Sequence, residues 1–153
     1  MKNKVDKILG WVLALLLAVM TLDVIWGVFT RYVVGYQSSW TDELARFLMI
    51  WLGVLGAAFA SGKDMHISID LLPQYLSIKN KKRLNILVSS IVVLFVFFAF
   101  IIGGMNYVYV SIALGQTSAA LNLPMWIVYA ILPISGVLLI YYRIYNTIKN
   151  SWK

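Results

Sequence analysis

The stretch Leu84–Tyr142, LNILVSSIVVLFVFFAFIIGGMNYVYVSIALGQTSAALNLPMWIVYAILPISGVLLIYY, decides the fold, because it runs for 59 residues without a charged side chain. A helix needs about 20 residues to cross the roughly 30 Å hydrocarbon core of a bilayer, so the stretch is too long for a single crossing. Small polar residues and a proline interrupt it at Gly115–Ser118, Asn122 and Pro124, where a helix readily stops. We therefore predict one turn there, between two spans.

Two further apolar runs lie before this stretch. Between Lys7 and Arg31 the only charged residue is Asp23, and between Glu43 and Lys63 the only charged residue is Arg46. Each run is long enough to cross a bilayer. We predict an all-α integral membrane protein, one domain over residues 1–153, with spans at about 8–30, 40–61, 84–114 and 123–145. Pro133 should kink the last span.

The composition agrees with a membrane protein and excludes several function classes. Hydrophobic residues make up 61% of the chain and charged residues 12%, against about 45–50% and about 25% in soluble domains. There is no cysteine and only one histidine, so thiol chemistry, iron–sulfur ligation and a zinc site are not expected. We expect no cofactor and no enzymatic activity. The net charge of +7 is interpreted as membrane orientation rather than nucleic-acid binding.

The basic residues predict that both termini are cytoplasmic. With the N-terminus inside, the cytoplasmic side holds Lys2, Lys4, Lys7, Lys63, Lys79, Lys81, Lys82, Arg83, Arg143, Lys149 and Lys153. Arg31 is then outside. The alternating segment Met65–Leu72 should lie along the cytoplasmic interface, and Lys79, Lys81, Lys82 and Arg83 should contact lipid headgroups. Aromatic residues near the span ends, among them Tyr142, are expected at the interface.

Asp23 and Arg46 are the ionisable residues predicted to lie within the membrane, where charge is costly. From the outer ends of their spans, Asp23 is roughly 12 Å deep and Arg46 roughly 9 Å deep at 1.5 Å per residue. We hypothesise an ion pair between them that fixes helix packing. In the alternative, Arg46 pairs within its own helix with Asp42 or Glu43.

Other candidate sites have simple structural explanations beside their functional ones. Asp42 and Glu43 fit the first turn of a helix, where acids favour the free amides, and they could equally bind a basic residue of a partner. Small residues that allow close helix approach recur in the second span at Gly53, Gly56, Ala57 and Ala60. As metal ligands, Asp64, His66 and Asp70 lack a closed set.

Several motifs together resemble one known family. They are Arg31-Tyr32, Trp40-Thr41-Asp42-Glu43-Leu44-Ala45-Arg46, Gly56-Ala57-Ala58, His66-Ile67-Ser68-Ile69-Asp70-Leu71-Leu72, and Gln116-Thr117-Ser118-Ala119-Ala120-Leu121 with Leu123-Pro124-Met125-Trp126. Their order and spacing resemble the small membrane subunit of tripartite ATP-independent periplasmic (TRAP) transporters, over nearly the whole chain. Ala119 departs from the pattern, since proline is expected there in many relatives.

The resemblance implies an accessory role in the bacterial inner membrane. In such systems a periplasmic binding protein delivers an organic anion, here sialic acid or a C4-dicarboxylate, to a large membrane subunit that moves it with sodium. The small subunit would support that large subunit and contact phospholipids. The resemblance points to partner contacts at Arg31, Trp40, Asp42, Glu43 and Arg46, then at Trp51 and the small residues of the second span.

A rival interpretation is a small proton-coupled multidrug exporter acting as a homodimer, with Asp23 as the proton site. It fits the presence of one acid in the first span. It fits the expected arginine partner less well, because an arginine would hold the carboxylate ionised.

Overall fold

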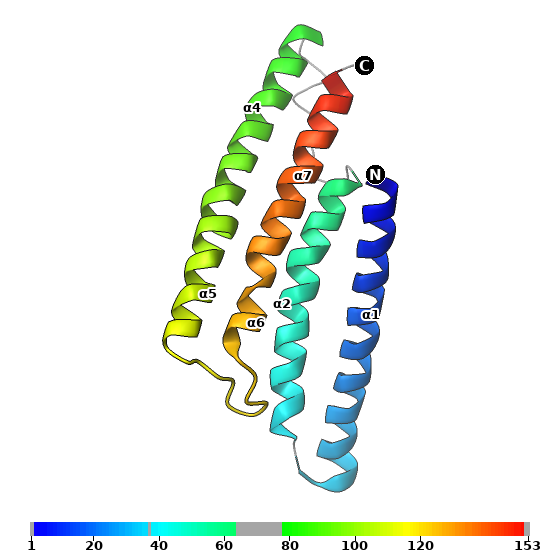
Figure 1. The fold of residues 1–153 in the computed structure, drawn as a ribbon. Coiled ribbons are helices and arrows are strands. Elements are labelled where there is room, and N and C mark those ends of the chain that lie inside the picture. Colours follow the sequence, from blue (N-terminus) through cyan, green and yellow to red (C-terminus); the bar gives the residue numbers. More distant parts are fainter. Residues whose placement is uncertain (1, 37, 64–77, 152–153) are drawn as a thin grey trace.

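The computed structural model describes residues 2–36, 38–63 and 78–151, and long helices dominate this part of the chain (Figure 1). In chain order the elements are α1 (Lys2–Phe29), the π-helical turn η1 (Thr30–Val34), α2 (Ser39–Gly62), α4 (Ile78–Val96), the π-helical segment η2 (Phe97–Ile102), α5 (Gly103–Ala113), α6 (Met125–Tyr129) and α7 (Ile131–Ser151). The predicted Met65–Leu72 segment lies outside the described residues, as do Asp64, His66 and Asp70.

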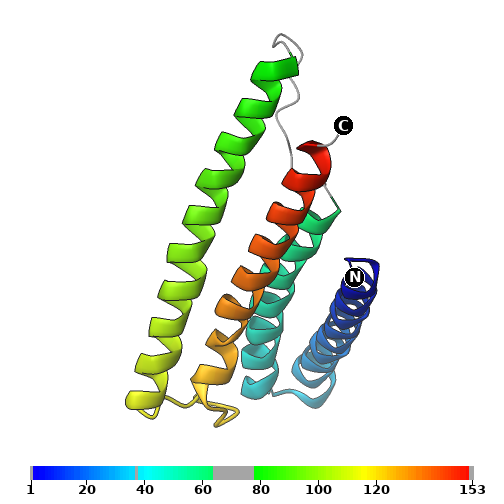
Figure 2. The ribbon, with the colours of Figure 1, turned by 45° about the horizontal axis from the view of Figure 1, so that its top comes forward.

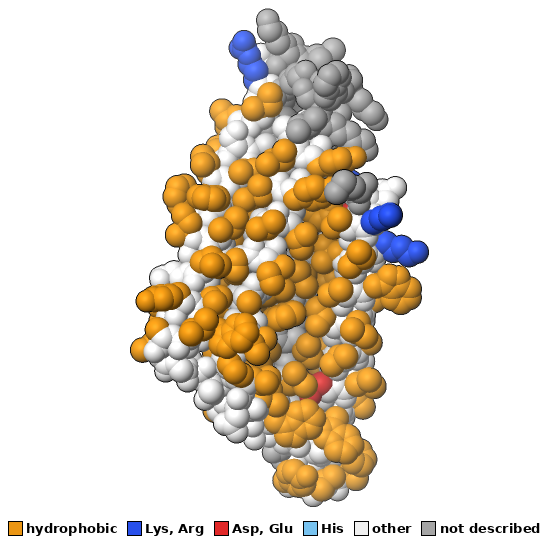
Figure 3. Space-filling model, in the orientation of Figure 1, with side chains coloured by type: hydrophobic (Ala, Val, Ile, Leu, Met, Phe, Trp, Pro, Cys, Tyr) orange, Lys and Arg blue, Asp and Glu red, His pale blue; other side chains and the backbone are white. Residues whose placement is uncertain are grey.

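Four helical stretches of the described chain are long and apolar enough to cross a membrane, which confirms the predicted fold class. They are Lys2–Val34, Ser39–Gly62, Ile86–Ala113 and Met125–Thr147. Hydrophobic side chains cover most of the face shown in Figure 3. Such a surface is stable in lipid and would aggregate in water.

The helices stand in a row. α1 packs on α2, α2 packs on α7, and α7 packs on α4 and η2, as both ribbon views show (Figures 1 and 2). One buried cluster joins α1, α2 and α7 through Leu9, Leu55, Ile131 and Tyr142. A second joins α2, α4 and α7 through Ala58, Val96 and Leu139. The central pair α2 and α7 therefore holds the row together.

Glycines set the close approach of the third and fourth spans. A Cβ added at Gly104 would lie 2.9 Å from Pro133 Cδ, and one added at Gly136 would lie 2.9 Å from Phe100 Cβ. Real Cβ atoms do not come this close, so both positions require glycine at this helix separation.

The last span is interrupted one turn before Pro133. Proline has no N–H to donate to the carbonyl four residues earlier, which belongs to Tyr129, the last residue of α6. Ala130 separates α6 from α7. The helix is therefore interrupted close to Pro133, where the sequence predicts a kink.

The two ends of the row carry different parts of the chain. The start of α1 and the end of α7 lie at one end, which we call the terminal end (Figure 1). The α1–α2 turn (30–38) and the α5–α6 loop (114–124) lie at the other, the turn end. Most of the predicted partner-contact residues lie on α2, which begins at the turn end.

Candidate functional site

Hydroxyl groups on both sides of the corner between α1 and α2 form hydrogen bonds with nearby backbone carbonyls. Thr30 Oγ1 donates to the carbonyl of Gly27 at 3.0 Å, and Thr41 Oγ1 donates to the carbonyl of Ser38 at 2.7 Å. A Cβ at Gly27 would lie 3.1 Å from Thr41 Oγ1. Gly35 turns the chain with a φ of +83°, a conformation that L side chains rarely adopt. This corner fixes the antiparallel register of α1 and α2.

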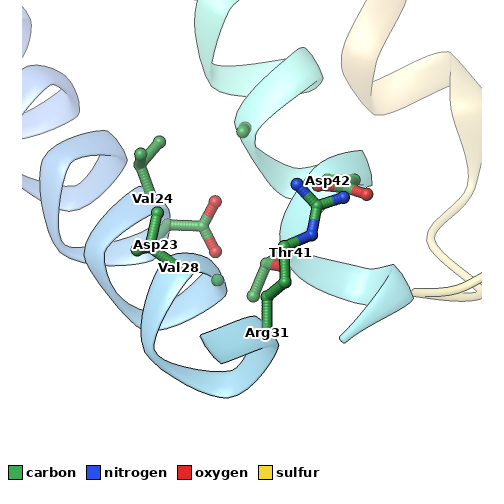
Figure 4. Close-up of a pocket in the computed structure, with 8 residues that line it drawn as sticks. Asp23, Val24, Val28, Arg31, Thr41 and Asp42 are labelled. Carbon is green, nitrogen blue, oxygen red and sulfur yellow. The ribbon is translucent and has the colours of Figure 1, made fainter. Parts of the chain in front are cut away.

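The register places Asp23 beside a small cavity between the two helices. With Gly27 opposite Thr41, one turn further along places Asp23 opposite Ala45. The cavity has a volume of about 120 Å³ and is lined by Asp23, Val24, Gly27, Val28, Arg31, Thr41, Asp42 and Ala45. Figure 4 shows the Asp23 carboxylate pointing into it, while the guanidinium end of Arg31 lies beside Asp42.

Asp23 is deeply buried and its carboxylate lacks a partner. The residue is 6% exposed, and neither carboxylate oxygen has a hydrogen-bond partner in the described structure. A buried polar group in this state is costly unless something outside the chain satisfies it.

Arg46 does not form the hydrogen-bonded pair with Asp23 that the sequence suggested. It does not line the cavity, and its side chain is exposed. The reason is the rotation of α2 about its own axis. Ala45 faces Asp23, and the next residue on a helix points about 100° away.

An apolar groove adjoins the cavity on the outside of the α1–α2 pair. Its volume is about 640 Å³, and its lining consists of Val19, Leu22, Asp23, Ile25, Trp26, Phe29, Trp40 and Leu44. Asp23 is shared by both spaces. Its carboxylate points into the cavity between the helices, so the groove ends beside the residue that carries this charge.

Glu43 ties α2 to the loop that joins α5 and α6. Its two carboxylate oxygens accept hydrogen bonds from three consecutive backbone N–H groups, Ala119 at 3.1 Å, Ala120 at 2.7 Å and Leu121 at 3.0 Å. Glu43 thus has an internal structural role that the sequence did not predict. A proline at position 119 would lack the first of these donors.

The loop itself is held by its own hydrogen bonds. Ser118 N–H donates to the carbonyl of Leu123 at 2.8 Å, and Met125 N–H donates to the carbonyl of Gln116 at 2.9 Å. Gly115 and Asn122 both have positive φ angles, 58° and 53°. The predicted turn is therefore present as a compact loop that presents its amides to Glu43.

The remaining predicted contact residues differ in exposure. Arg31, Trp40 and Asp42 are exposed at the turn end. On α2, Gly53 and Ala57 are exposed and Gly56 and Ala60 are half-buried, and a Cβ at Gly53 or Gly56 would meet nothing within 4 Å. Trp51, in contrast, packs against the buried cluster of Leu9 and Tyr142. Of the basic residues at the start of α4, Arg83 has a described side chain, and it is exposed.

The polar contacts at the terminal end were not predicted from the sequence. Tyr142, predicted to lie at the interface, is fully buried and donates to Asp6 Oδ1 at 2.7 Å. Lys2 Nζ donates to Asn146 Oδ1, and Asn146 Nδ2 donates to the carbonyl of Ser61, each at 2.9 Å. The only signal in the sequence is Gly62, whose missing Cβ leaves room for the ring of Tyr142.

Comparison with known proteins shows which family this chain matches. Residues 20–151 match the DctQ component of tripartite ATP-independent periplasmic transporters. The sialic acid TRAP transporter small permease protein SiaQ of Vibrio cholerae is 31% identical, over 96% of this chain and 83% of that protein. The C4-dicarboxylate TRAP transporter small permease protein DctQ of Rhodobacter capsulatus is 30% identical, over 69% of this chain and 46% of that protein.

A third relative joins the same region to a much longer chain. The sialic acid TRAP transporter permease protein SiaT of Haemophilus influenzae is 31% identical over 91% of this chain, which covers 22% of SiaT. Small TRAP permeases pair with a large permease subunit. With four membrane-spanning helices and this match, the chain belongs to the DctQ component family of TRAP transporters, as a multi-pass inner-membrane transporter subunit rather than an enzyme.

Proposed function

We propose that this chain is the accessory small subunit of a sodium-driven TRAP transporter that imports an organic anion, and that it supports the large subunit rather than carrying the substrate. Sialic acid is the first candidate substrate, because the similarity to SiaQ covers nearly the whole chain. A C4-dicarboxylate is the second, from the shorter match to DctQ.

The volumes and the linings of the two cavities support the accessory role. Small-molecule sites usually have volumes of about 300–1,000 Å³ with several converging polar groups. The cavity at Asp23 is about 120 Å³, and its lining holds two carboxylates, Asp23 and Asp42, against one guanidinium, Arg31, so its net negative charge repels an anion. The larger groove is lined by apolar side chains with Asp23 as its one charged residue. Neither suits a hydrophilic organic anion.

The rival exporter also finds less support than the subunit. Family membership favours a chain that works with a large permease, and the exposed large hydrophobic side chains along the helix row form broad apolar faces for such a partner. We propose that the open small-residue face of α2 (Gly53, Gly56, Ala57, Ala60) packs against the large subunit, since missing side chains allow close helix approach.

The turn end is proposed to face the periplasm and to meet the binding protein through Arg31, Trp40 and Asp42. The basic residues support this orientation, because Lys2, Lys4, Lys7, Lys63, Arg83 and Arg143 all belong to helix ends at the terminal end, whereas Arg31 lies at the turn end. Headgroup contact by Lys79, Lys81, Lys82 and Arg83 follows from the same orientation.

Co-purification and reconstitution test the proposal. The tagged chain, purified from its host in mild detergent, should carry a large permease in equal amount. In proteoliposomes, uptake of labelled sialic acid should need the large subunit, the binding protein and an inward sodium gradient. Uptake by the small chain alone, or its recovery as a homodimer without a large subunit, would show that the accessory role is wrong.

A further inference from the structure

The cavity at Asp23 is one positive charge short. Its lining holds two carboxylates, Asp23 and Asp42, and one guanidinium, Arg31. Asp23 is the member without a hydrogen-bond partner, although it is more than nine-tenths buried. An unpaired carboxylate at this depth requires a cation or a proton.

The approach to Asp23 restricts which cation can reach it. The adjoining groove is lined by Val19, Leu22, Ile25, Trp26, Phe29, Trp40 and Leu44. A hydrated ion would lose its water against such a wall. A lysine or arginine side chain has an apolar stem that fits the groove and a charged head that can extend past it toward the cavity between α1 and α2, into which the Asp23 carboxylate points.

The donor set does not favour a metal ion. Across the residues that the structure describes, no group of three or more His, Cys, Asp and Glu side chains is placed to hold one. The cavity volume, about 120 Å³, is well above the roughly 10–15 Å³ that one water molecule requires. An ammonium or guanidinium head fits that space.

We propose that Asp23 is the counter-ion of a lysine or arginine on a membrane-spanning segment of the large permease subunit, with the stem of that side chain lying in the apolar groove. This inference rests on the proposed function, because it needs a large partner in the membrane. The ion pair would fix the depth and rotation of one partner helix against the α1–α2 pair. Removing one member of a buried ion pair strongly destabilises the contact, because the other charge is left buried without a partner.

The test uses the full complex of small and large subunits, co-expressed and purified in mild detergent. Asp23→Asn keeps the shape of the side chain and removes its charge, and Asp23→Glu keeps the charge. We expect Asp23→Asn to lower retention of the large subunit about tenfold after a detergent and salt wash, and Asp23→Glu to restore most of it. Asp6→Asn is the matched control, because it removes a carboxylate from the other end of the same helix and keeps an acceptor for Tyr142.

Charge reversal identifies the partner residue. Asp23→Lys should abolish the complex, and changing single lysines or arginines in the spans of the large subunit to aspartate should restore it at one position. Normal retention with Asp23→Asn would overturn the counter-ion, since a neutral side chain would then suffice. Loss with Asp23→Asn that no basic-to-acidic change rescues in the Asp23→Lys background would also overturn it. If the wild-type chain retains no large subunit, the proposed function itself fails, which is a different result.

Discussion

Glu43 shows how one side chain can hold two hairpins together. Its carboxylate accepts three backbone N–H bonds from the α5–α6 loop, 76 to 78 residues further along the chain. Hydrogen bonds to a charged acceptor are stronger than those between neutral groups. At the turn end, where Ala119 is exposed, water competes for the same groups and reduces their contribution to stability.

Glu43→Ala should therefore free the loop without unfolding the helices. We expect a modest loss in the free energy of unfolding, because water replaces part of the lost bonding. Hydrogen exchange in detergent should show faster exchange at the amides of residues 119–121. Asp42→Ala, which removes the neighbouring carboxylate, should leave exchange at these amides slow. Unchanged exchange in Glu43→Ala would contradict the assigned role.

Two glycines of α2 predict opposite results for the same substitution. A Cβ at Gly62 would lie 2.8 Å from the ring of Tyr142, whereas a Cβ at Gly53 would meet nothing within 4 Å. Gly62→Ala should destabilise the isolated chain by about 1–3 kcal/mol through overpacking. Gly53→Ala should be neutral or slightly stabilising, since alanine favours a helix by about 1 kcal/mol. Thermal unfolding of both variants in one detergent distinguishes them, and equal melting temperatures would contradict the packing at Tyr142.

At the scale of the element, span lengths were predictable and helix rotations were not. The charge-free stretch and the two shorter apolar runs predict four spans, because bilayer thickness sets the length that a helix needs, and four helices long and apolar enough to cross a membrane are present. The sequence also predicts a depth for Arg46. It does not predict the direction of this side chain, since the register depends on Gly27 packing on Thr41 across the helix pair. Likewise, no pattern in the sequence around Glu43 predicts that its carboxylate binds the amides of a loop so distant in sequence.

The open face of α2 gives a prediction about assembly. Gly53→Leu with Ala57→Leu should leave the isolated chain as stable as the wild type, because both positions are exposed within it. The same change should reduce co-purification of the large subunit at least tenfold, since the added side chains hold the partner helix away. Ala99→Leu with Ala113→Leu, at exposed positions of η2 and α5, is the control. Equal loss in both double variants would show that added bulk, rather than this face, is responsible.

At the scale of the whole molecule, the row of helices leaves both broad faces apolar. The buried clusters are small, with Leu9, Leu55, Ile131 and Tyr142 in one and Ala58, Val96 and Leu139 in the other. Most large apolar side chains are exposed to the surroundings instead. Sequence patterns cannot say which of these surfaces meets lipid and which meets protein, because both are apolar.

Orientation in the membrane can be tested with single cysteines, since the chain has none of its own. Tyr36→Cys and Gln116→Cys lie at the turn end, and Lys4→Cys and Arg83→Cys lie at the terminal end, all at exposed positions. A membrane-impermeant maleimide should label the first two in intact spheroplasts and the last two only after permeabilisation. The reverse pattern would place the termini in the periplasm.

The contact between Glu43 and the α5–α6 loop also orders events during synthesis. At about 5–20 residues per second, the 76 residues between Glu43 and Ala119 take roughly 4–15 s to make. For most of that interval α1 and α2 are complete while the amides that Glu43 binds have not yet been made. The first hairpin must therefore persist in the bilayer on its own corner contacts, and the bond that joins the two halves forms only when the second hairpin arrives.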